Sequence, residues 1–262
     1  MLKFRAVFAL LIFSLALRLA YAWHGHRAGY IPTSSDQYET IALNLLSGAG
    51  YAIVPGVPTA AREPVYPLFI AACYAPFGRM PWLVIALQCL MGTATCALAW
   101  RLGRRLFGEG VGLAALAVCA VYPQFIYYSA YFFRDTLLAF LFAVLAWASA
   151  DWAAESADPA GDISAQLGGC AAAGLGLANS AHLPAVALAG AALWLAAPRK
   201  ARTRRALLYF APLVLAFGAW SARNVRTFGV VVAGSTHGGE EFYQALVVPP
   251  EDLGTMRQTE IL

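Results

Sequence analysis

The residues of this chain that could do chemistry are few, and they stand at the edges of long apolar runs. They comprise two carboxylates, three arginines and one histidine, namely Asp36, Arg62, Arg134, Asp135, His182 and Arg223. Carboxylates accept protons, and guanidinium groups bind phosphates and carboxylates. Ionisable side chains at the ends of apolar segments cost free energy and often serve function. The available chemistry is therefore proton transfer and anion binding.

Asp36 belongs to a segment that is expected to form a short amphipathic helix. Apolar residues recur at helical spacing from position 38 to position 45, Ser34 with Gln37 fits a capping box, and Gly48-Ala49-Gly50 should end the helix. Asp36 would then lie in the first turn, where backbone N–H groups and the helix dipole favour its ionised form. The same position suits an acid with a purely structural role, so the pattern alone leaves both interpretations open.

Arg62 precedes a short apolar segment, residues 66–77, that is bounded by prolines and a glycine. An apolar run of about 10–14 residues is more often interfacial or re-entrant than spanning, so we expect a short helix at the outer surface of a membrane. An arginine beside such a helix can hold an anionic lipid head group. It can also position the helix by extending into the polar interface.

Composition excludes several classes of protein. Of the 262 residues, 60% are hydrophobic and 12% are charged, whereas a soluble domain is about 45–50% apolar and about 25% charged. A water-soluble globule and a disordered chain are therefore excluded. The net charge is +4, and all the basic residues except Arg18 lie outside the apolar runs, so a nucleic acid is not an expected partner. The five cysteines lie in apolar stretches and lack metal-ligand spacing.

Seven apolar segments are long enough, or nearly long enough, to cross a bilayer. They cover residues 6–22, 81–100, 111–128, 136–150, the two halves of 166–197 on either side of a break at 179–184, and 206–220. The first segment could also be a cleaved signal peptide, because Ala20-Tyr21-Ala22 resembles a cleavage site. The apolar segments that follow it favour an uncleaved first helix.

The distribution of charge predicts the orientation of these spans. Ten Lys and Arg residues fall in short segments on one side, and seven fall in longer segments on the other. Because basic loops remain in the cytoplasm, the N-terminus and the loop 199–205 are expected inside. We therefore expect an all-α polytopic membrane helix bundle, with a large extracytoplasmic first loop, 23–80, that carries interfacial helices. Residues 1–222 would form this transmembrane domain and residues 223–262 an extracytoplasmic tail.

Five motifs occur in an order that is familiar from one superfamily of proteins. They are Asp36-x-Tyr38, Arg62-x-Pro64-x-Tyr66-Pro67, Arg134-Asp135-Thr136-Leu137-Leu138, Gly174-x-Gly176-Leu177-Ala178 with His182-x-Pro184, and Trp220-x-x-Arg223-Asn224. This ordered set resembles membrane glycosyltransferases of the GT-C superfamily, in the branch akin to protein O-mannosyltransferases and the lipid A aminoarabinose transferase. Members of that branch are longer, so the chain resembles a truncated member whose tail begins a missing C-terminal part.

The resemblance implies a reaction and a role for each candidate residue. A sugar would pass, with inversion, from a polyprenyl-phosphate donor to a lipid or protein acceptor on the outer face of the cell membrane. Asp36 would be the catalytic base, and Asp135 a second catalytic carboxylate that orients the acceptor or holds a cation. Arg62, Arg223 and His182 would bind the donor phosphate, although the family usually has Arg or Lys where His182 stands.

The sequence assigns no certain cofactor, although a divalent cation is compatible with Asp135. His24-Gly25-His26 has no third ligand at metal-binding spacing, so no metal site is assigned. The expected partners are the polyprenyl-phosphate-linked sugar, its acceptor and membrane lipids.

Two other functions stay open. One is a membrane transporter or lipid flippase, although such proteins often have two related halves and this chain has no internal repeat. The other is a non-catalytic relative that retains the fold.

Overall fold

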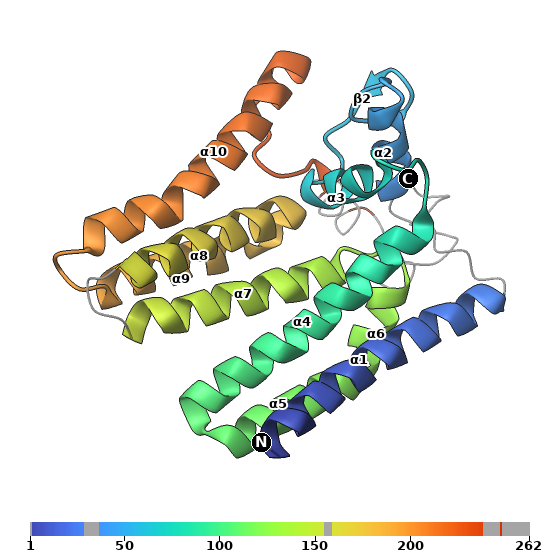
Figure 1. The fold of residues 1–262 in the computed structure, drawn as a ribbon. Coiled ribbons are helices and arrows are strands. Elements are labelled where there is room, and N and C mark those ends of the chain that lie inside the picture. Colours follow the sequence, from blue (N-terminus) through green and yellow to red (C-terminus); the bar gives the residue numbers. More distant parts are fainter. Residues whose placement is uncertain (1, 29–36, 155–158, 238–246, 248–262) are drawn as a thin grey trace.

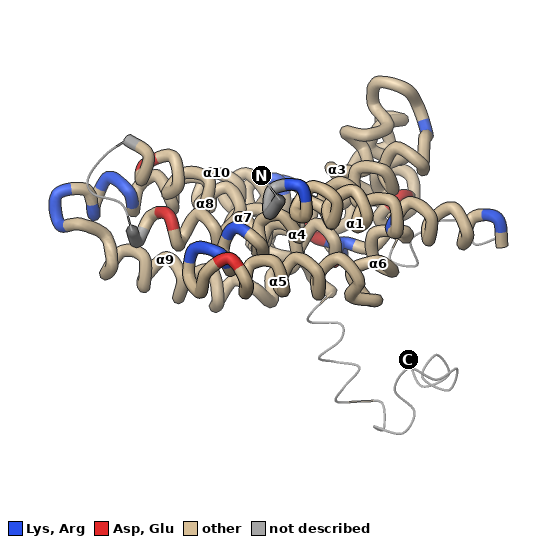
Figure 2. The backbone as a smooth tube through the Cα atoms, turned by 60° about the horizontal axis from the view of Figure 1, so that its bottom comes forward, with Lys and Arg blue, Asp and Glu red and all other residues tan. Residues whose placement is uncertain are grey.

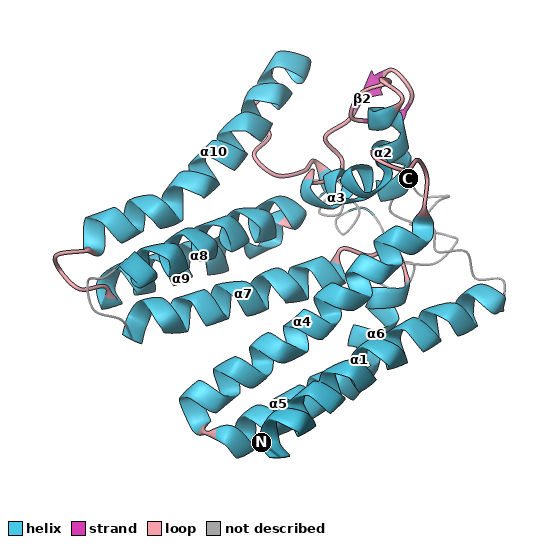
Figure 3. Cartoon of the chain, viewed as in Figure 1, coloured by secondary structure: helices cyan, strands magenta, loops and turns pink. Residues whose placement is uncertain are grey.

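The chain is almost entirely helical in the computed structural model, which describes residues 2–28, 37–154, 159–237 and 247. The long helices lie side by side (Figure 1). They are α1 (Leu2–Arg27), α4 (Pro81–Phe107), α5 (Glu109–Val121), α6 (Pro123–Ala130), α7 (Asp135–Ala154), α8 (Pro159–Ala178), α9 (Leu183–Ala196) and α10 (Arg202–Phe228). Strands are confined to one small hairpin in the described part (Figure 3). The expected all-α membrane helix bundle is therefore confirmed.

The number of helices that can cross a membrane is lower than the seven predicted spans. Among the described helices, α1, α4, α7 and α10 are long and apolar enough, and the bent pair α5–α6 raises the number to five. Helices α8 and α9 correspond to the two halves of the predicted 166–197 segment. Helix α9 has only 14 residues, and α8 is rich in glycine and alanine. The small side chains allow α8 and α9 to pack closely against their neighbours. Both helices contribute to one apolar core with α7 and α10.

Apolar side chains on the long helices point outward as well as inward. Phe8 and Ile12 of α1, Leu188 of α9, and Val214 and Leu215 of α10 are large hydrophobic residues that remain exposed. A helix that is apolar on all sides needs an apolar surrounding, because water would make this exposed surface unfavourable. These exposed apolar faces therefore suit contact with lipid.

The predicted span 111–128 is two helices rather than one. Helices α5 and α6 meet at an angle of 50°. Pro123 begins α6, and Tyr122 before it has an extended backbone with ψ of 117°. A proline disfavours the helical conformation in the residue that precedes it, so the chain bends at this position.

The loop between α1 and α4 contains two short helices and the hairpin. They are α2 (Tyr38–Leu46), β1 (Ala52–Val54), β2 (Val57–Pro58) and α3 (Val65–Tyr74). Pro55-Gly56 forms the hairpin turn, and Gly56 has a φ of 78°, a conformation that glycine adopts without steric cost. Helix α3 has 10 residues, so the predicted short helix over 66–77 is confirmed as too short to span.

The predicted start of α2 is wrong. The helix begins at Tyr38, and the capping position is Gln37, which has a left-handed φ of 64° and makes no side-chain cap. The acid in the first turn of α2 is Glu39. Both Ser34 and Asp36 lie outside the described residues.

The helices alternate in direction, so the loops gather at two ends of the bundle (Figures 1 and 2). The N-terminus, the α4–α5 junction and the α9–α10 loop share one end, which we call the basic end. The opposite end, which we call the loop end, holds α2, the hairpin and α3 with the starts of α4 and α7. Helix α10 continues past position 222, the expected domain boundary, as far as Phe228.

Candidate functional site

A buried carboxylate, Glu63, joins four segments at the loop end. It stands directly before the proline that precedes α3, and only 5% of its surface is exposed. One oxygen accepts a hydrogen bond from Arg134 Nη1 at 3.0 Å. The other accepts from the backbone N–H and the hydroxyl of Ser180, at 3.2 and 2.9 Å, and from the hydroxyl of Ser235 at 3.0 Å. The loop before α3, the start of α7, the α8–α9 turn and the segment after α10 are therefore fixed to one another.

Arg134 completes this network from just before α7. Besides Glu63, its Nη1 donates to the carbonyl of Ala178 at 3.1 Å. Ala178 is the last residue of α8, where unpaired carbonyl groups give the helix end a partial negative charge. The guanidinium group is thus held between a carboxylate and a helix C-terminus, both of which stabilise its positive charge.

Arg62 lies beside the network and is held there by its backbone. The hydroxyl of Tyr51 donates a hydrogen bond that the backbone carbonyls of Arg62 and Glu63 share, at 3.0 and 3.1 Å. Burial and the neighbouring Glu63 raise the pKa of Tyr51 well above its usual range, so the phenol keeps its proton. The Arg62 side chain is half-buried, and its Nη1 donates to the carbonyl of Ala61 at 3.3 Å.

Arg223 of α10 holds the same loop from the other side. Its Nη1 donates to the carbonyl of Thr59 at 2.7 Å, and its Nη2 donates to the carbonyl of Tyr51 at 3.1 Å. The guanidinium group also lies over the rings of Tyr51 and Trp220, at 5.4 and 5.2 Å from their centroids. The contacts of this arginine therefore anchor the hairpin and the Arg62 loop to α10.

His182 ends the turn between α8 and α9 and is half-buried. Its ring packs edge-on against Phe142 of α7, with 4.9 Å between the ring centroids. Burial, together with the positive charge of Arg134, lowers the pKa of His182 below its ordinary value of 6.5. The imidazole is therefore neutral at pH 7, so it can offer a hydrogen bond but no charge.

This lowered pKa gives a prediction for the pH dependence of the site. Because the folded protein disfavours the charged imidazole, His182 should take up a proton only as the pH falls below 6.5, and protonation at lower pH should destabilise the fold. An NMR titration of the imidazole, assigned with a His182→Gln variant, should give a midpoint below 6.5. Added polyprenyl phosphate should raise the midpoint if phosphate binds beside the ring. A midpoint above 6.5 in the free protein would contradict this account of the electrostatics.

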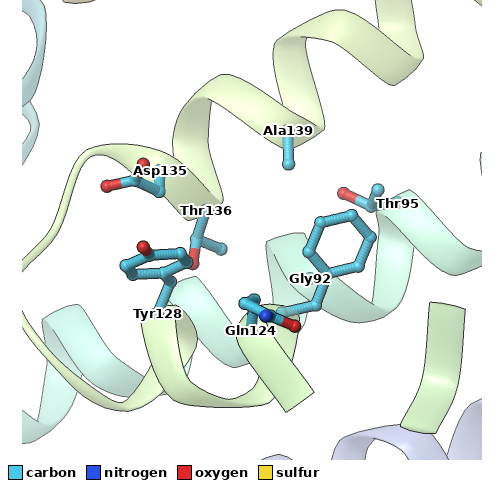
Figure 4. Close-up of a pocket in the computed structure, with 8 residues that line it drawn as sticks. Gly92, Thr95, Gln124, Tyr128, Asp135, Thr136 and Ala139 are labelled. Carbon is cyan, nitrogen blue, oxygen red and sulfur yellow. The ribbon is translucent and has the colours of Figure 1, made fainter. Parts of the chain in front are cut away.

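Asp135 is the first residue of α7 and lines a cavity of about 170 Å³ between α4, α6 and α7. Figure 4 shows Asp135 and Thr136 beside Tyr128 and Gln124 of α6. The hydroxyl of Thr136 is buried and has no hydrogen-bond partner among the described residues. A buried hydroxyl of this kind can bond a molecule that enters the cavity. Carboxylate, hydroxyl, amide and aromatic groups converge here, which suits a polyhydroxylated ligand.

Asp36 itself lies outside the described residues, but the residues that follow it are placed close to Asp135. The ring of Tyr38 packs edge-on against Tyr66 of α3, with 5.0 Å between centroids. Burial raises the pKa of Tyr66 well above its usual range, and the neighbouring Tyr38 and Asp135 raise it further. The Tyr66 hydroxyl, which donates to Gln88 of α4, thus lies near both the start of α2 and the start of α7.

The structure therefore groups the predicted site residues in two adjoining places. Arg62, His182 and Arg223 lie close to the Glu63 network without bonding to Glu63 in the contacts described above, whereas Asp135, the residue after Arg134, lines the cavity. Sequence analysis missed Glu63, which is the only carboxylate between Glu39 and Glu109. That isolation, immediately beside Arg62 in an apolar chain, is the signal that could have identified it.

Potential metal ligands do not gather in the described part of the chain, where no group of three or more His, Cys, Asp or Glu side chains could hold an ion. His26 instead packs against the rings of Trp23 and Trp82, with centroid distances of 6.4 and 5.1 Å. An aromatic contact accounts for this histidine without a metal.

The fold and the site together define a multi-pass membrane protein with a buried ionic network at one end of its helices. Residues 58–222, more than half of the chain, match the family described as dolichyl-phosphate-mannose-protein mannosyltransferase, and the chain belongs to this family. It is therefore a membrane glycosyltransferase of the GT-C kind. Curated proteins and solved structures give no match. The matched region contains Arg62, Glu63, Arg134, Asp135 and His182.

Proposed function

We propose that the protein transfers a sugar from a polyprenyl-phosphate donor to a lipid or protein acceptor on the outer face of the cell membrane. The observation that carries this proposal is the position of Arg62, which adjoins the Glu63–Arg134 ion pair, itself next to Asp135 and its cavity. A cation for phosphate and a cavity with a carboxylate and hydroxyl groups for a sugar are then linked through the consecutive residues Arg134 and Asp135. Both belong to segments that match the mannosyltransferase family.

The proposed reaction is a direct displacement at the anomeric carbon. The acceptor hydroxyl attacks this carbon, the bond to the phosphate oxygen breaks, and polyprenyl phosphate leaves with the bonding electron pair. Asp36 accepts the proton that the hydroxyl loses. One displacement of this kind inverts the configuration of the anomeric carbon. Asp135 orients the hydroxyl groups of the acceptor or the sugar, or holds a divalent cation.

The proposed roles of the basic residues follow from their contacts. Arg62 stabilises the charge that develops on the departing phosphate. His182 donates a hydrogen bond from a neutral ring. Arg223 is a weaker candidate for direct phosphate contact, because its contacts to Tyr51 and Thr59 point to the positioning of the Arg62 loop.

We also propose that the loop end faces outward and that the N-terminus is cytoplasmic. The support is the charge distribution, since basic residues gather at the opposite end and basic loops remain in the cytoplasm. Val57 in the hairpin is exposed and offers a site for a cysteine. In a cysteine-free background, Val57→Cys should react with a membrane-impermeant maleimide in intact cells. Reaction only after lysis would reverse the orientation.

The Arg62→Ala variant tests the phosphate site. Phosphate is charged in both the bound donor and the transition state, so the loss of Arg62 should weaken donor binding and also slow the chemical step. We expect a higher KM for the polyprenyl-phosphate sugar together with a lower kcat. Steady-state assays in detergent measure both constants.

Arg27→Ala serves as the control for this variant. Arg27 is an exposed arginine of α1 at the same end of the bundle, and it lies over Trp23. Its loss should leave both constants near those of the unmodified protein. Equal effects of the two substitutions would show that general charge, rather than Arg62, binds the donor.

A further inference from the structure

A second cavity, at the basic end, is lined mainly by arginines. It has a volume of about 250 Å³ between α4 and α7, and its lining residues are Arg101, Arg104, Arg105, Trp147 and Asp151. Three guanidinium groups therefore face one carboxylate. The cavity lies at the end of the bundle opposite to the Glu63 network, so the proposed glycosyl transfer does not use it.

The ion pairs leave part of this positive charge uncompensated. Asp151 pairs with Arg105. Glu109 lies 3.9 Å from Arg104 Nε, the outer limit for an ion pair, and half of the Arg104 side chain is exposed. Arg101 lies over the ring of Trp147, with 5.2 Å from the guanidinium carbon to the centroid. Three arginines against Asp151 and Glu109 leave a net positive charge at the cavity, which a further anion can compensate.

The surroundings of the cavity are those of a membrane interface. Trp147 lines it, and Trp100 stacks with Arg104 at 4.5 Å. Tryptophan favours the level of the lipid head groups. Leu106 and Phe107, at the end of α4, are exposed apolar residues on the same turns as the arginines. An anion that binds here is thus beside apolar surface that acyl chains can cover.

We propose that this cavity binds the phosphate of an anionic phospholipid. The phosphodiester group would lie between Arg101 and Arg104, the head group against Trp147, and the acyl chains along the exposed end of α4. Basic pockets between membrane helices bind anionic head groups in this way, because guanidinium groups form paired hydrogen bonds to phosphate oxygens. The inference is independent of the glycosyltransferase reaction.

Lipid retention by the full chain tests this site. The protein is exchanged into nanodiscs of phosphatidylcholine with a minority of phosphatidylglycerol, then extracted, and the retained lipids are counted by native mass spectrometry. The unmodified protein should retain phosphatidylglycerol in preference to phosphatidylcholine. The double variant Arg101→Gln/Arg104→Gln should lose about fivefold in this preference for each arginine removed. Equal retention of the two lipids by the unmodified protein overturns the proposal without any variant.

A charge-matched control separates the cavity from the general basic charge. Arg199→Gln/Lys200→Gln removes two exposed charges from the α9–α10 loop at the same end, and neither residue lines the cavity. This control variant should retain phosphatidylglycerol as the unmodified protein does. A loss of phosphatidylglycerol equal to that of Arg101→Gln/Arg104→Gln contradicts the proposal.

Competition by inorganic phosphate and by glycerol phosphate is the last comparison. If either displaces phosphatidylglycerol at millimolar concentration, the cavity binds soluble phosphates and not a lipid. Thermal unfolding in phosphatidylcholine alone should be the same for all variants.

Discussion

Asp36→Asn is expected to lower the turnover of sugar transfer by about 10²–10⁴-fold, the usual contribution of a general base. The amide has nearly the same size as the carboxylate but lacks an oxygen basic enough to accept the acceptor's proton. Donor binding and folding should change little, because Asp36 precedes α2 and that helix begins at Tyr38. Single-turnover assays with a radiolabelled donor measure the chemical step, and equilibrium binding measures the affinity.

The matched control is Glu39→Gln, which removes a carboxylate three positions further along. Glu39 pairs with Arg79 and accepts a hydrogen bond from Tyr74, so its loss should reduce stability and leave the chemical step intact. Transfer by Asp36→Asn at the rate of the unmodified protein would remove Asp36 from the mechanism. Asp135 would then be the remaining candidate for the base.

Glu63→Ala is expected to lower the free energy of unfolding by about 3–5 kcal/mol, the cost of breaking a buried ion pair. The substitution leaves Arg134 without its carboxylate and frees the hydrogen bonds of Ser180 and Ser235. It should also reduce activity, because the Arg62 backbone is held through the same turn. Denaturant titration in mild detergent and donor binding measure the two effects.

Two further variants give this prediction its controls. Glu109→Gln breaks the long contact with Arg104 at the basic end and should cost only about 0–1 kcal/mol. Glu63→Gln/Arg134→Met removes both charges of the buried pair and should be more stable than Glu63→Ala, since no unpaired charge remains. A loss for Glu63→Ala no larger than that for Glu109→Gln would show that the carboxylate does not organise the loop end.

The local features of the fold could be predicted from sequence because their causes are local. Apolar length predicts α1, α4, α7 and α10, prolines bound the short helix α3, and Asn179-Ser180-Ala181-His182-Leu183-Pro184 marks the turn between α8 and α9. The start of α2 was misplaced because a capping motif is a weak signal, and Gln37 adopts a left-handed conformation instead. Helices α8 and α9 occupy the two halves of the predicted 166–197 segment, although α9 has only 14 residues.

The Glu63 network could not be predicted because its contacts are not local. Glu63 meets partners that are 71, 117 and 172 positions away along the chain. Periodicity and spacing describe neighbours within a few turns and carry no information about such pairs. Arg223 shows the same limit. Its motif indicated a phosphate ligand, whereas its contacts with Thr59 and Tyr51 depend on how α10 packs against a distant hairpin.

The most direct test of the central claim is the release of polyprenyl phosphate by the purified full chain in detergent. A donor labelled in both the sugar and the lipid is incubated with an acceptor extract, and both products are followed. Since detergent abolishes the separation of the two membrane faces, a flippase would leave the donor intact. The proposal requires many polyprenyl phosphates released per protein, with the sugar recovered on the acceptor, and almost none for Asp36→Asn. An intact donor with the unmodified protein, across the polyprenyl-phosphate sugars tested, would contradict the proposed function.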